Sequence, residues 1–319
     1  MGKLLITGGA GFIGSNLAKI THQQGWDVTI LDNLSSGLQS TANKLEKLGI
    51  KVIIGDIRDQ GLLHNSLTGF AAVVHLAAQV SVPVSVKNPE ETMEINVKGT
   101  QNVIQACLKN NVRRLVMASS AAVYGEADNF PLKEEDAGDV LSPYADSKWA
   151  NEQQILDARQ QGLQATALRF FNVYGAGQRP DGAYAAVIPK FADMMAKGVA
   201  PKINGDGLHT RDFVHVGDVC NAIMTLIAGE WKAEQHHVYN VATQTKIPLL
   251  DLVAEINESL TNLVSDFKPI VPTHGPERIG DIRHSMASIT RISTTLDWAP
   301  SKDFKQGIHE LVLERINLM

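Results

Sequence analysis

Tyr144 and Lys148 are four residues apart at the start of a stretch, 144–161, whose composition is typical of a helix. At this spacing the two side chains share one helix face, so the ammonium lies beside the phenol. A neighbouring positive charge favours the phenolate and lowers the pKa of a tyrosine from its usual value of about 10. Tyr144 is therefore predicted to take a proton from a substrate hydroxyl near neutral pH, as a general base.

The YxxxK spacing also occurs in ordinary helices, so a catalytic interpretation of Tyr144 and Lys148 needs further support. Two serines provide it. Ser119 and Ser120 close an apolar run that begins at residue 114. If the run is a parallel strand, Ser120 lies at the carboxyl edge of the sheet, where doubly wound sheets bind ligands. Its hydroxyl can then bridge the phenol and a substrate oxygen. The alternative interpretation is that both serines bond to the local backbone.

A second chemical signal is GGAGFIG at residues 8–14, between an apolar run and a helical stretch. Gly8, Gly11 and Gly14 allow a tight turn, close approach of backbone N–H groups to a pyrophosphate, and close packing of helix on strand. Asp32 ends the next apolar run, where a carboxylate can accept hydrogen bonds from both ribose hydroxyls and would repel a 2′-phosphate. The pattern predicts NAD rather than NADP, and the alternative is that the glycines serve only as a turn.

The elements that must hold these residues are short apolar runs rich in β-branched side chains, each typical of a buried parallel strand. The runs are 3–7, 28–31, 51–55, 72–76, 114–119 and 165–170, and helical stretches between them include 12–24, 90–110 and 144–161. Residues 1–172 are therefore predicted to form a doubly wound parallel α/β sheet, with some later segments returning to it. Glycine and proline punctuate 173–319, which predicts a smaller C-terminal α/β substrate lobe and a cleft between the two parts.

Composition limits the class of protein. The 319 residues are 44% hydrophobic and 20% charged, as in ordinary globular proteins. A net charge of -5 argues against binding to nucleic acid or an anionic membrane surface, and no apolar run is long enough to cross a bilayer. Only Cys107 and Cys220 occur, without metal-ligand spacing, so we expect no disulfide, no metal site and a cytoplasmic location.

The GxxGxxG spacing resembles that of extended short-chain dehydrogenase/reductases of the nucleotide-sugar epimerase/dehydratase family. Similar motifs follow over nearly the whole chain: LDNLSSG, GDIRD, HLAAQ, NVKGT, SSAAVYG, YADSK, RFFNVYG, TRDFVHVGDV and, at 280–284, GDIRH. The resemblance is nearest to UDP-glucose and UDP-N-acetylglucosamine 4-epimerases. It implies a Rossmann sheet, tightly bound NAD and a UDP-sugar as substrate.

The resemblance also implies which residues meet the cofactor. In the family Asp56 and Ile57 flank the adenine, 76–79 passes along the nicotinamide, and Lys148 hydrogen-bonds the nicotinamide ribose. The implied cofactor set is Gly8, Gly11, Phe12, Ile13, Gly14, Asp32, Asn33, Ser36, Gly37, Asp56, Ile57, Leu76, Ala77, Ala78, Gln79, Asn96, Ser119, Tyr144, Lys148 and Phe171.

Substrate contacts are implied in the same way. Arginine suits a diphosphate because its planar guanidinium offers paired donors, although a single arginine is more often an ordinary surface residue. Asp281 is implied to bind the nucleoside ribose, and PKINGDG at 201–207 resembles the edge that holds uracil. The implied substrate set is Ser120, Tyr144, Asn172, Val187, Ile203, Arg211, Arg278, Asp281 and Ser285.

The residues after Ser120 narrow the reaction. Dehydratases that this chain resembles carry an Asp-Glu pair there, one acid of which protonates a departing hydroxyl, and related decarboxylases use a glutamate in this stretch. Here the positions are Ala121 and Ala122. A base and a hydride acceptor remain, and they suffice to oxidise one carbon and reduce it again. The interpretation is 4-epimerisation of a UDP-hexose through a transient 4-keto sugar.

Ser285 bears on which sugar is used. In related epimerases restricted to plain hexoses this position is a bulky tyrosine, and a serine leaves space beside carbon 2 for an N-acetyl group. The hypothesis is interconversion of UDP-N-acetylglucosamine and UDP-N-acetylgalactosamine, with the UDP-glucose and UDP-galactose pair as a second reaction. The alternatives are a UDP-glucuronic acid 4-epimerase or another nucleotide-sugar oxidoreductase of this family, and, more remotely, a non-catalytic NAD-binding protein.

Two further expectations concern the rest of the surface. Apolar positions within 93–108 and 149–156 favour a homodimer, as is frequent in the family, although packing on the protein's own sheet gives the same pattern. The acidic run 133–139 is interpreted as a solvated loop. The histidines are expected to be structural or exposed: His75, His209, His215, His236, His237 and His284.

Overall fold

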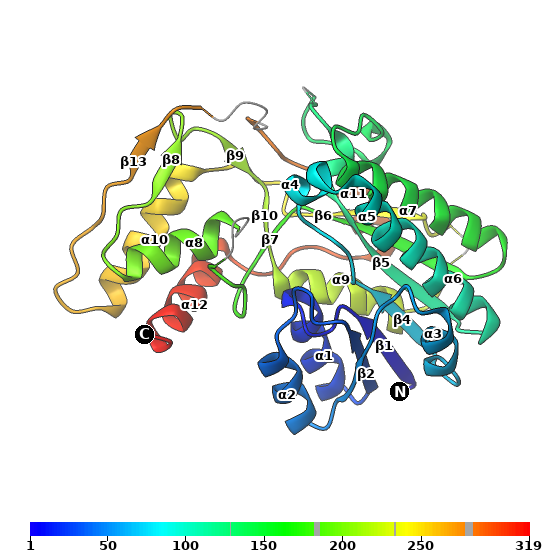
Figure 1. The fold of residues 1–319 in the computed structure, drawn as a ribbon. Helices are drawn as coiled ribbons and strands as arrows, with labels where there is room; N and C mark the ends of the chain where they lie inside the picture. The colour runs from blue at the N-terminus through cyan, green and yellow to red at the C-terminus, as the bar shows by residue number, and fades with distance from the viewer. Residues whose placement is uncertain (128, 182–185, 233, 278–282) are drawn as a thin grey trace.

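The computed structural model describes residues 1–127, 129–181, 186–232, 234–277 and 283–319. Its central feature is a parallel sheet of seven strands in the order β3-β2-β1-β4-β5-β6-β11 (Figure 1). The strands are β1 (Lys3–Thr7), β2 (Asp27–Asp32), β3 (Lys51–Ile54), β4 (Ala72–His75), β5 (Arg114–Ser120), β6 (Gln164–Phe170) and β11 (Val238–Val241). The strand order reverses between β1 and β4, so ligands are expected at the carboxyl ends of these two strands.

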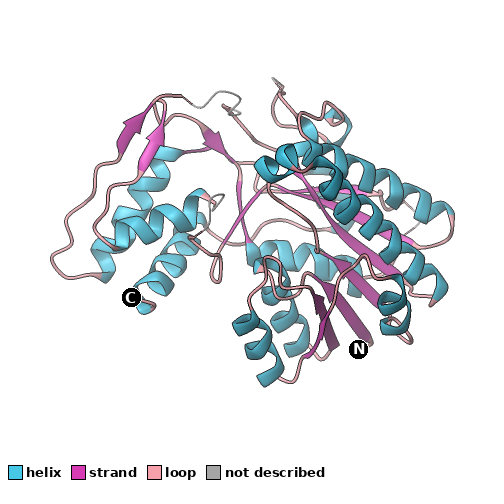
Figure 2. Ribbon diagram, in the orientation of Figure 1, coloured by secondary structure: helices cyan, strands magenta, loops and turns pink. Residues whose placement is uncertain are grey.

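The predicted doubly wound α/β class is confirmed, because helices cover both faces of the sheet (Figure 2). One face packs on α1 (Phe12–Gln23), α2 (Gln39–Lys47), α9 (Val216–Ala228) and α11 (Thr290–Leu296). The other packs on α3 (Gln60–Ser66), α6 (Gly99–Lys109) and α7 (Pro143–Gln160). Six of the seven strands were predicted as apolar runs, as expected of buried parallel strands, whereas β11 was not predicted.

The stretch predicted as one helix over 90–110 is interrupted. It consists of α5 (Pro89–Met93), a π-helical turn η1 (Glu94–Lys98) and α6. The wider turn directs Asn96 inward, where its Nδ2 donates to Gln79 O at 2.9 Å and to Ser147 Oγ at 2.9 Å. Its Oδ1 accepts from Gln79 N at 2.8 Å. The irregular turn therefore ties the loop after β4 to the helix that carries Tyr144 and Lys148.

A second core lies beside the carboxyl edge of the sheet, on the left in Figure 1. It is built from α8 (Val187–Ala196), α10 (Leu249–Leu263) and α12 (Phe304–Asn317), with the short strands β8 (Lys202–Asn204) and β13 (Thr273–Gly275) paired at its rim. β7 (Asn172–Tyr174) pairs in parallel with β10 (Phe213–His215), and β9 (Thr210–Arg211) pairs with β12 (Ile247–Pro248). Within the described residues no helix is long and apolar enough to cross a membrane.

Candidate active site

The glycine turn after β1 is too crowded for side chains. Gly8 has a φ of +68° and donates its N–H to Leu31 O at 2.8 Å. A Cβ on Gly14 would lie 2.2 Å from Gly8 O, and one on Gly8 would lie 2.7 Å from Ala77 N. Glycine at the N-cap of α1, Gly11, offers no side-chain oxygen to the first N–H groups of the helix. Those groups are left to a ligand, which is the arrangement that binds a pyrophosphate.

Asp32 is buried at the end of β2 and oriented by the backbone. Its Oδ2 accepts from Ala10 N at 2.9 Å and its Oδ1 from Leu34 N at 2.8 Å. A Cβ on Gly37 would lie 2.9 Å from Oδ1, so this glycine leaves room for the carboxylate. Each oxygen keeps a lone pair for a ribose hydroxyl. Phe12 and Ile13 begin α1 close by and pack partly buried against the sheet.

On the adenine side of the predicted site, the carboxylate of Asp56 accepts hydrogen bonds from neighbouring side chains. Asn33 Nδ2 donates to Asp56 Oδ2 at 2.9 Å, and the Arg58 guanidinium donates to both carboxylate oxygens. Hydrogen bonds from Arg58 hold the pKa of Asp56 well below its usual range. Ile57 instead turns its side chain into the core between the sheet and α6, so only its backbone is free to meet a ligand. Ser36 is exposed on the loop after β2.

Residues 76–79 follow β4 and lie at the switch point of the sheet, and the buried side chain of Phe171 follows β6 along the same edge. Asn96, predicted as a cofactor contact, has both amide hydrogens committed to protein oxygens and therefore acts on the site through Gln79 and Ser147. His75 is buried between Thr7 and Thr100, and burial lowers its pKa to about 3. His75 is thus a buried, hydrogen-bonded side chain, in line with the expectation that the histidines are structural or exposed.

The structure brings Ser120, Tyr144 and Lys148 together between β5 and α7. Ser142 caps α7 by accepting from Ala145 N at 3.1 Å, which places Tyr144 in the first turn. The Ser120 hydroxyl lies beside the Tyr144 phenol, and Lys148 Nζ donates to Ala118 O at 2.9 Å. Ser85 in α4 (Val82–Lys87) was not predicted, and its Oγ accepts from the N–H of Tyr144 at 3.1 Å. No sequence signal distinguished it from the other serines.

The predicted lowering of the Tyr144 pKa is wrong for the protein chain by itself. Burial raises the pKa of this phenol, and the hydrogen bond from Ser120 opposes the rise only in part. The lysine ammonium is directed at the backbone of β5, where it bonds to Ala118 O. A low-dielectric surrounding disfavours the phenolate, and spacing along the helix does not report that cost.

Lys148 should make stability increase with pH in the alkaline range. Burial lowers its pKa to about 8, with Glu152 opposing. Between about pH 8 and about pH 10 the unfolded chain holds this proton and the folded chain does not, so the free energy of unfolding rises with pH. Relative to Lys148→Met, the wild type should gain about 1–3 kcal/mol over this window, measured by urea unfolding. Lys19→Met, which removes the same charge at an exposed position of α1, is the control.

The residues predicted to bind substrate lie on the second lobe, next to the carboxyl edge of the sheet. Their side chains differ in exposure. Asn172 begins β7 and its Nδ2 donates to Asp212 O at 3.2 Å, while Arg211 Nη1 donates to Thr210 O at 2.9 Å. Val187 is half-buried at the start of α8. The side chain of Ile203 is 1% exposed in the lobe core, so only its backbone can meet a nucleotide. Arg278 and Asp281 lie outside the described residues.

Ser285 lies in a segment that is fastened on two sides. Its N–H donates to Thr210 O at 3.2 Å, and the neighbouring Met286 O accepts from Leu132 N at 2.9 Å. The residue is half-buried. The segment after the undescribed residues therefore lies between the second lobe and the loop that follows β5.

Asp212 was not predicted from the sequence, yet its carboxylate hydrogen-bonds several segments of this region to one another. It is fully buried, and burial raises its pKa. Its Oδ1 accepts from the N–H and hydroxyl of Thr243, at 2.8 and 2.7 Å, and its Oδ2 from Gln244 N at 3.0 Å and Ala287 N at 3.2 Å. One carboxylate thus joins β10, the end of the main sheet and the Ser285 segment. The available signal was a lone acid next to the apolar run after Arg211.

Comparison with known proteins identifies the family of this chain. The NAD dependent epimerase/dehydratase family matches residues 4–242. The chain belongs to this family. A UDP-glucose 4-epimerase of Mycolicibacterium smegmatis is 33% identical over 320 residues, which are 97% of this chain and 97% of that protein.

Solved structures agree with the family assignment. A UDP-N-acetylglucosamine 4-epimerase from Methanobrevibacter ruminantium M1, in complex with UDP-N-acetylmuramic acid, has a TM-score of 0.91 and 35% identity over 100% of this chain and 99% of that one. The UDP-glucose 4-epimerase of Thermus thermophilus, in complex with NAD, has a TM-score of 0.85 and 32% identity over 98% of each chain. The family is NAD-dependent, and the glycine turn with its oriented Asp32 fits that cofactor.

Proposed function

We propose that this protein is a UDP-sugar 4-epimerase that interconverts UDP-N-acetylglucosamine and UDP-N-acetylgalactosamine, with UDP-glucose and UDP-galactose as a second pair. The observation that carries the proposal is the Tyr144 phenol beside Ser120, one helical turn before Lys148 on α7. After Ser120 the chain runs into a short 3₁₀ turn that begins with Ala121 and Ala122. With no acid at these two positions, the machinery supports oxidation and reduction at one carbon without loss of water.

The residues of the chain divide the work at carbon 4. Ser120 orients the sugar hydroxyl, and Tyr144 takes its proton and later returns it. NAD, when bound, would supply the acceptor and donor of hydride for carbon 4. Lys148 carries a second positive charge beside the tyrosine and, as the family resemblance implies, a donor for the nicotinamide ribose. The keto sugar must turn over before reduction, so the site must hold the diphosphate more firmly than the sugar.

Ser285 supports the N-acetylated sugars. Serine is a small side chain, and its segment is held by the bond from Ser285 N to Thr210 O. The similar structure from Methanobrevibacter ruminantium M1 is named as a UDP-N-acetylglucosamine 4-epimerase, whereas the Thermus thermophilus structure is named for UDP-glucose. Arg211, together with Arg278 and Asp281, is assigned to the nucleoside diphosphate handle that these sugars share.

A panel of UDP-sugars followed by NMR tests the proposal. Purified protein is incubated with the N-acetylglucosamine, glucose and glucuronic acid derivatives, and inversion at carbon 4 is expected for the first, with slower inversion of the second. Turnover of the uronic acid alone would establish the UDP-glucuronic acid alternative. Stoichiometric NADH would indicate net oxidation by another oxidoreductase of the family. NAD binding without turnover of any sugar would leave a non-catalytic protein.

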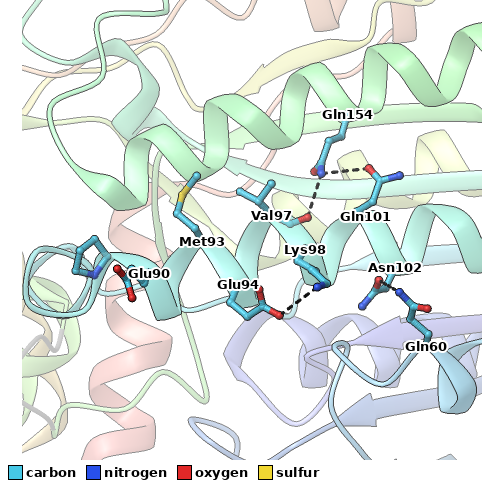
Figure 3. Close-up of a pocket in the computed structure, with 10 residues that line it drawn as sticks. Gln60, Glu90, Met93, Glu94, Val97, Lys98, Gln101, Asn102 and Gln154 are labelled. Carbon is cyan, nitrogen blue, oxygen red and sulfur yellow. Dashed lines mark hydrogen bonds and ion pairs between the residues drawn. The ribbon is translucent and has the colours of Figure 1, made fainter.

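We also propose that the protein forms a homodimer through the outer faces of η1, α6 and α7. A pocket of about 720 Å³ lies on this face, and its lining includes Met93, Val97 and, from α7, Gln154. Figure 3 shows how these side chains lie. Glu94 and Lys98 form an exposed ion pair with a separation of 3.7 Å. A patch with an apolar centre and both signs of charge can match a copy of itself across a two-fold axis.

Val97→Arg should convert a dimer into a monomer, because a guanidinium placed in the apolar centre of a two-fold patch meets a second copy of itself. Light scattering after size exclusion should show about half the wild-type mass at micromolar concentration. Val271→Arg, at a valine that is 80% exposed, is the matched control and should leave the mass unchanged. A Val97→Arg protein that kept the wild-type mass would place the interface elsewhere.

A further inference from the structure

The end of β5 meets α7 at three successive residues. Ala118 O accepts from Lys148 Nζ at 2.9 Å, Ser119 Oγ donates to Glu152 Oε1 at 2.5 Å, and Ser120 lies beside the Tyr144 phenol. The α7 residues involved, 144, 148 and 152, are each one turn apart and share one face of the helix. Two of these contacts use residues already assigned to the reaction, and the third uses a carboxylate that the mechanism has left without a role.

Glu152 is 1% exposed and bound on two sides. Besides Ser119, its Oε1 accepts from Arg169 Nε at 2.9 Å, and its Oε2 accepts from Arg169 Nη2 at 2.7 Å. Ser119 and Arg169 are register partners on β5 and β6, so the carboxylate lies across a matched pair of donors. Arg169 Nη1 is held in turn by Tyr124 Oη and Glu134 O. The position of the carboxylate is therefore determined from both strands.

A gain in folding stability does not by itself explain the buried ion pair between Glu152 and Arg169. A buried ion pair loses the hydration of both charges, and apolar residues of similar volume are often as stabilising. Glu152 nevertheless lies one helical turn from Lys148 and bonds to Ser119, the residue before Ser120, where a displacement of about an ångström costs a large part of the rate. The location of Glu152 therefore indicates a role in the reaction rather than in stabilising the core.

We propose that Glu152 is a positioning residue: held by Arg169, its carboxylate keeps Ser120 on β5 in register with Tyr144 on α7 and provides the negative charge that the Lys148 ammonium faces. This inference rests on the proposed function of the three catalytic residues. The other charged and titratable groups around this point are His75 on β4, which burial keeps neutral, and Tyr144 on α7 itself. On the far side of Glu152 are Arg169 and, before β11, His237.

Glu152→Gln separates charge from hydrogen bonding, because the amide can still accept from Ser119. Glu152 raises the pKa of Lys148 against the effect of burial, so its neutralisation should move the alkaline limb of the kcat profile to lower pH by about one unit. The value of kcat at its optimum should fall by about tenfold, with KM nearly unchanged, since the nucleotide contacts lie elsewhere. Glu152→Asp should restore the alkaline limb without restoring kcat. Asp157→Asn, an exposed charge on the same helix, is the control and should change neither.

A second variant and a second readout keep the test decisive. If Glu152→Gln does not fold, Ser119→Ala removes only the strand contact and should lower kcat several-fold with an unchanged alkaline limb. Protonation of Lys148 can also be measured without turnover. The free energy of unfolding of each protein is compared, as a function of pH, with that of the same protein carrying Lys148→Met, and the pH at which the two curves separate reports the titration of Lys148. This measurement does not need epimerase activity, so it tests the role of Glu152 even if the proposed function is wrong. Wild-type kcat, pH profile and Lys148 titration in a folded Glu152→Gln protein would overturn the inference.

Discussion

The Tyr144→Phe variant should lose turnover at carbon 4 by about three orders of magnitude, the usual worth of a positioned general base. The change removes only the phenol oxygen beside Ser120, so the sugar proton loses its acceptor at that place. Its backbone N–H keeps its bond to Ser85 Oγ at 3.1 Å, and the first turn of α7 should be preserved. Initial rates with the UDP-sugar that reacts fastest give the measurement.

The control for this variant is another tyrosine that loses only its hydroxyl. Tyr239→Phe removes an oxygen that accepts from His236 N at 2.9 Å, on the amino side of β11 and away from the reaction edge. It should retain wild-type kcat and NAD content. The NAD content of Tyr144→Phe should also match the wild type. Retention of activity in Tyr144→Phe would contradict the mechanism for the N-acetylated sugars, the plain hexoses and the uronic acid alike.

Ser285→Tyr should abolish epimerisation of the N-acetylated sugars and spare the plain hexoses. The Ser285 N–H donates to Thr210 O, and the neighbouring Met286 O accepts from Leu132 N, so the backbone cannot withdraw to admit a large ring. A clash with the acetamido group is a repulsive element that acts on one substrate only. We expect kcat/KM for UDP-N-acetylglucosamine to fall at least about a hundredfold, a loss of about 2.7 kcal/mol in transition-state binding.

Ser285→Ala distinguishes volume from the serine hydroxyl. The smaller side chain should leave both activities close to wild type, whereas Ser285→Tyr should change the ratio of the two kcat/KM values. Thermal unfolding of both variants should be measured, because the segment is half-buried. A tyrosine variant that turns over both classes of sugar at the wild-type ratio would show that this segment does not set specificity.

Much of the fold could be predicted from local patterns. Strands buried on both faces, such as β1 and β4, are continuous apolar runs, and the glycines of the first turn are required where a Cβ would strike Gly8 O or Ala77 N. These signals depend on neighbours within a few residues, so one chain contains them. The π-helical turn within 90–110 was not predictable, because it depends on Asn96 meeting Gln79 and Ser147.

The sequence by itself determined which residues carry the chemistry: a tyrosine and a lysine one helical turn apart, a serine at the end of a strand, and a glycine turn followed by Asp32. Only the tertiary structure decided how they are held and charged. Burial raises the pKa of Tyr144, and Glu152 and Asp212 join segments far apart along the chain. Spacing reports neighbours along a helix, whereas desolvation and buried hydrogen bonds depend on every segment that closes around a group.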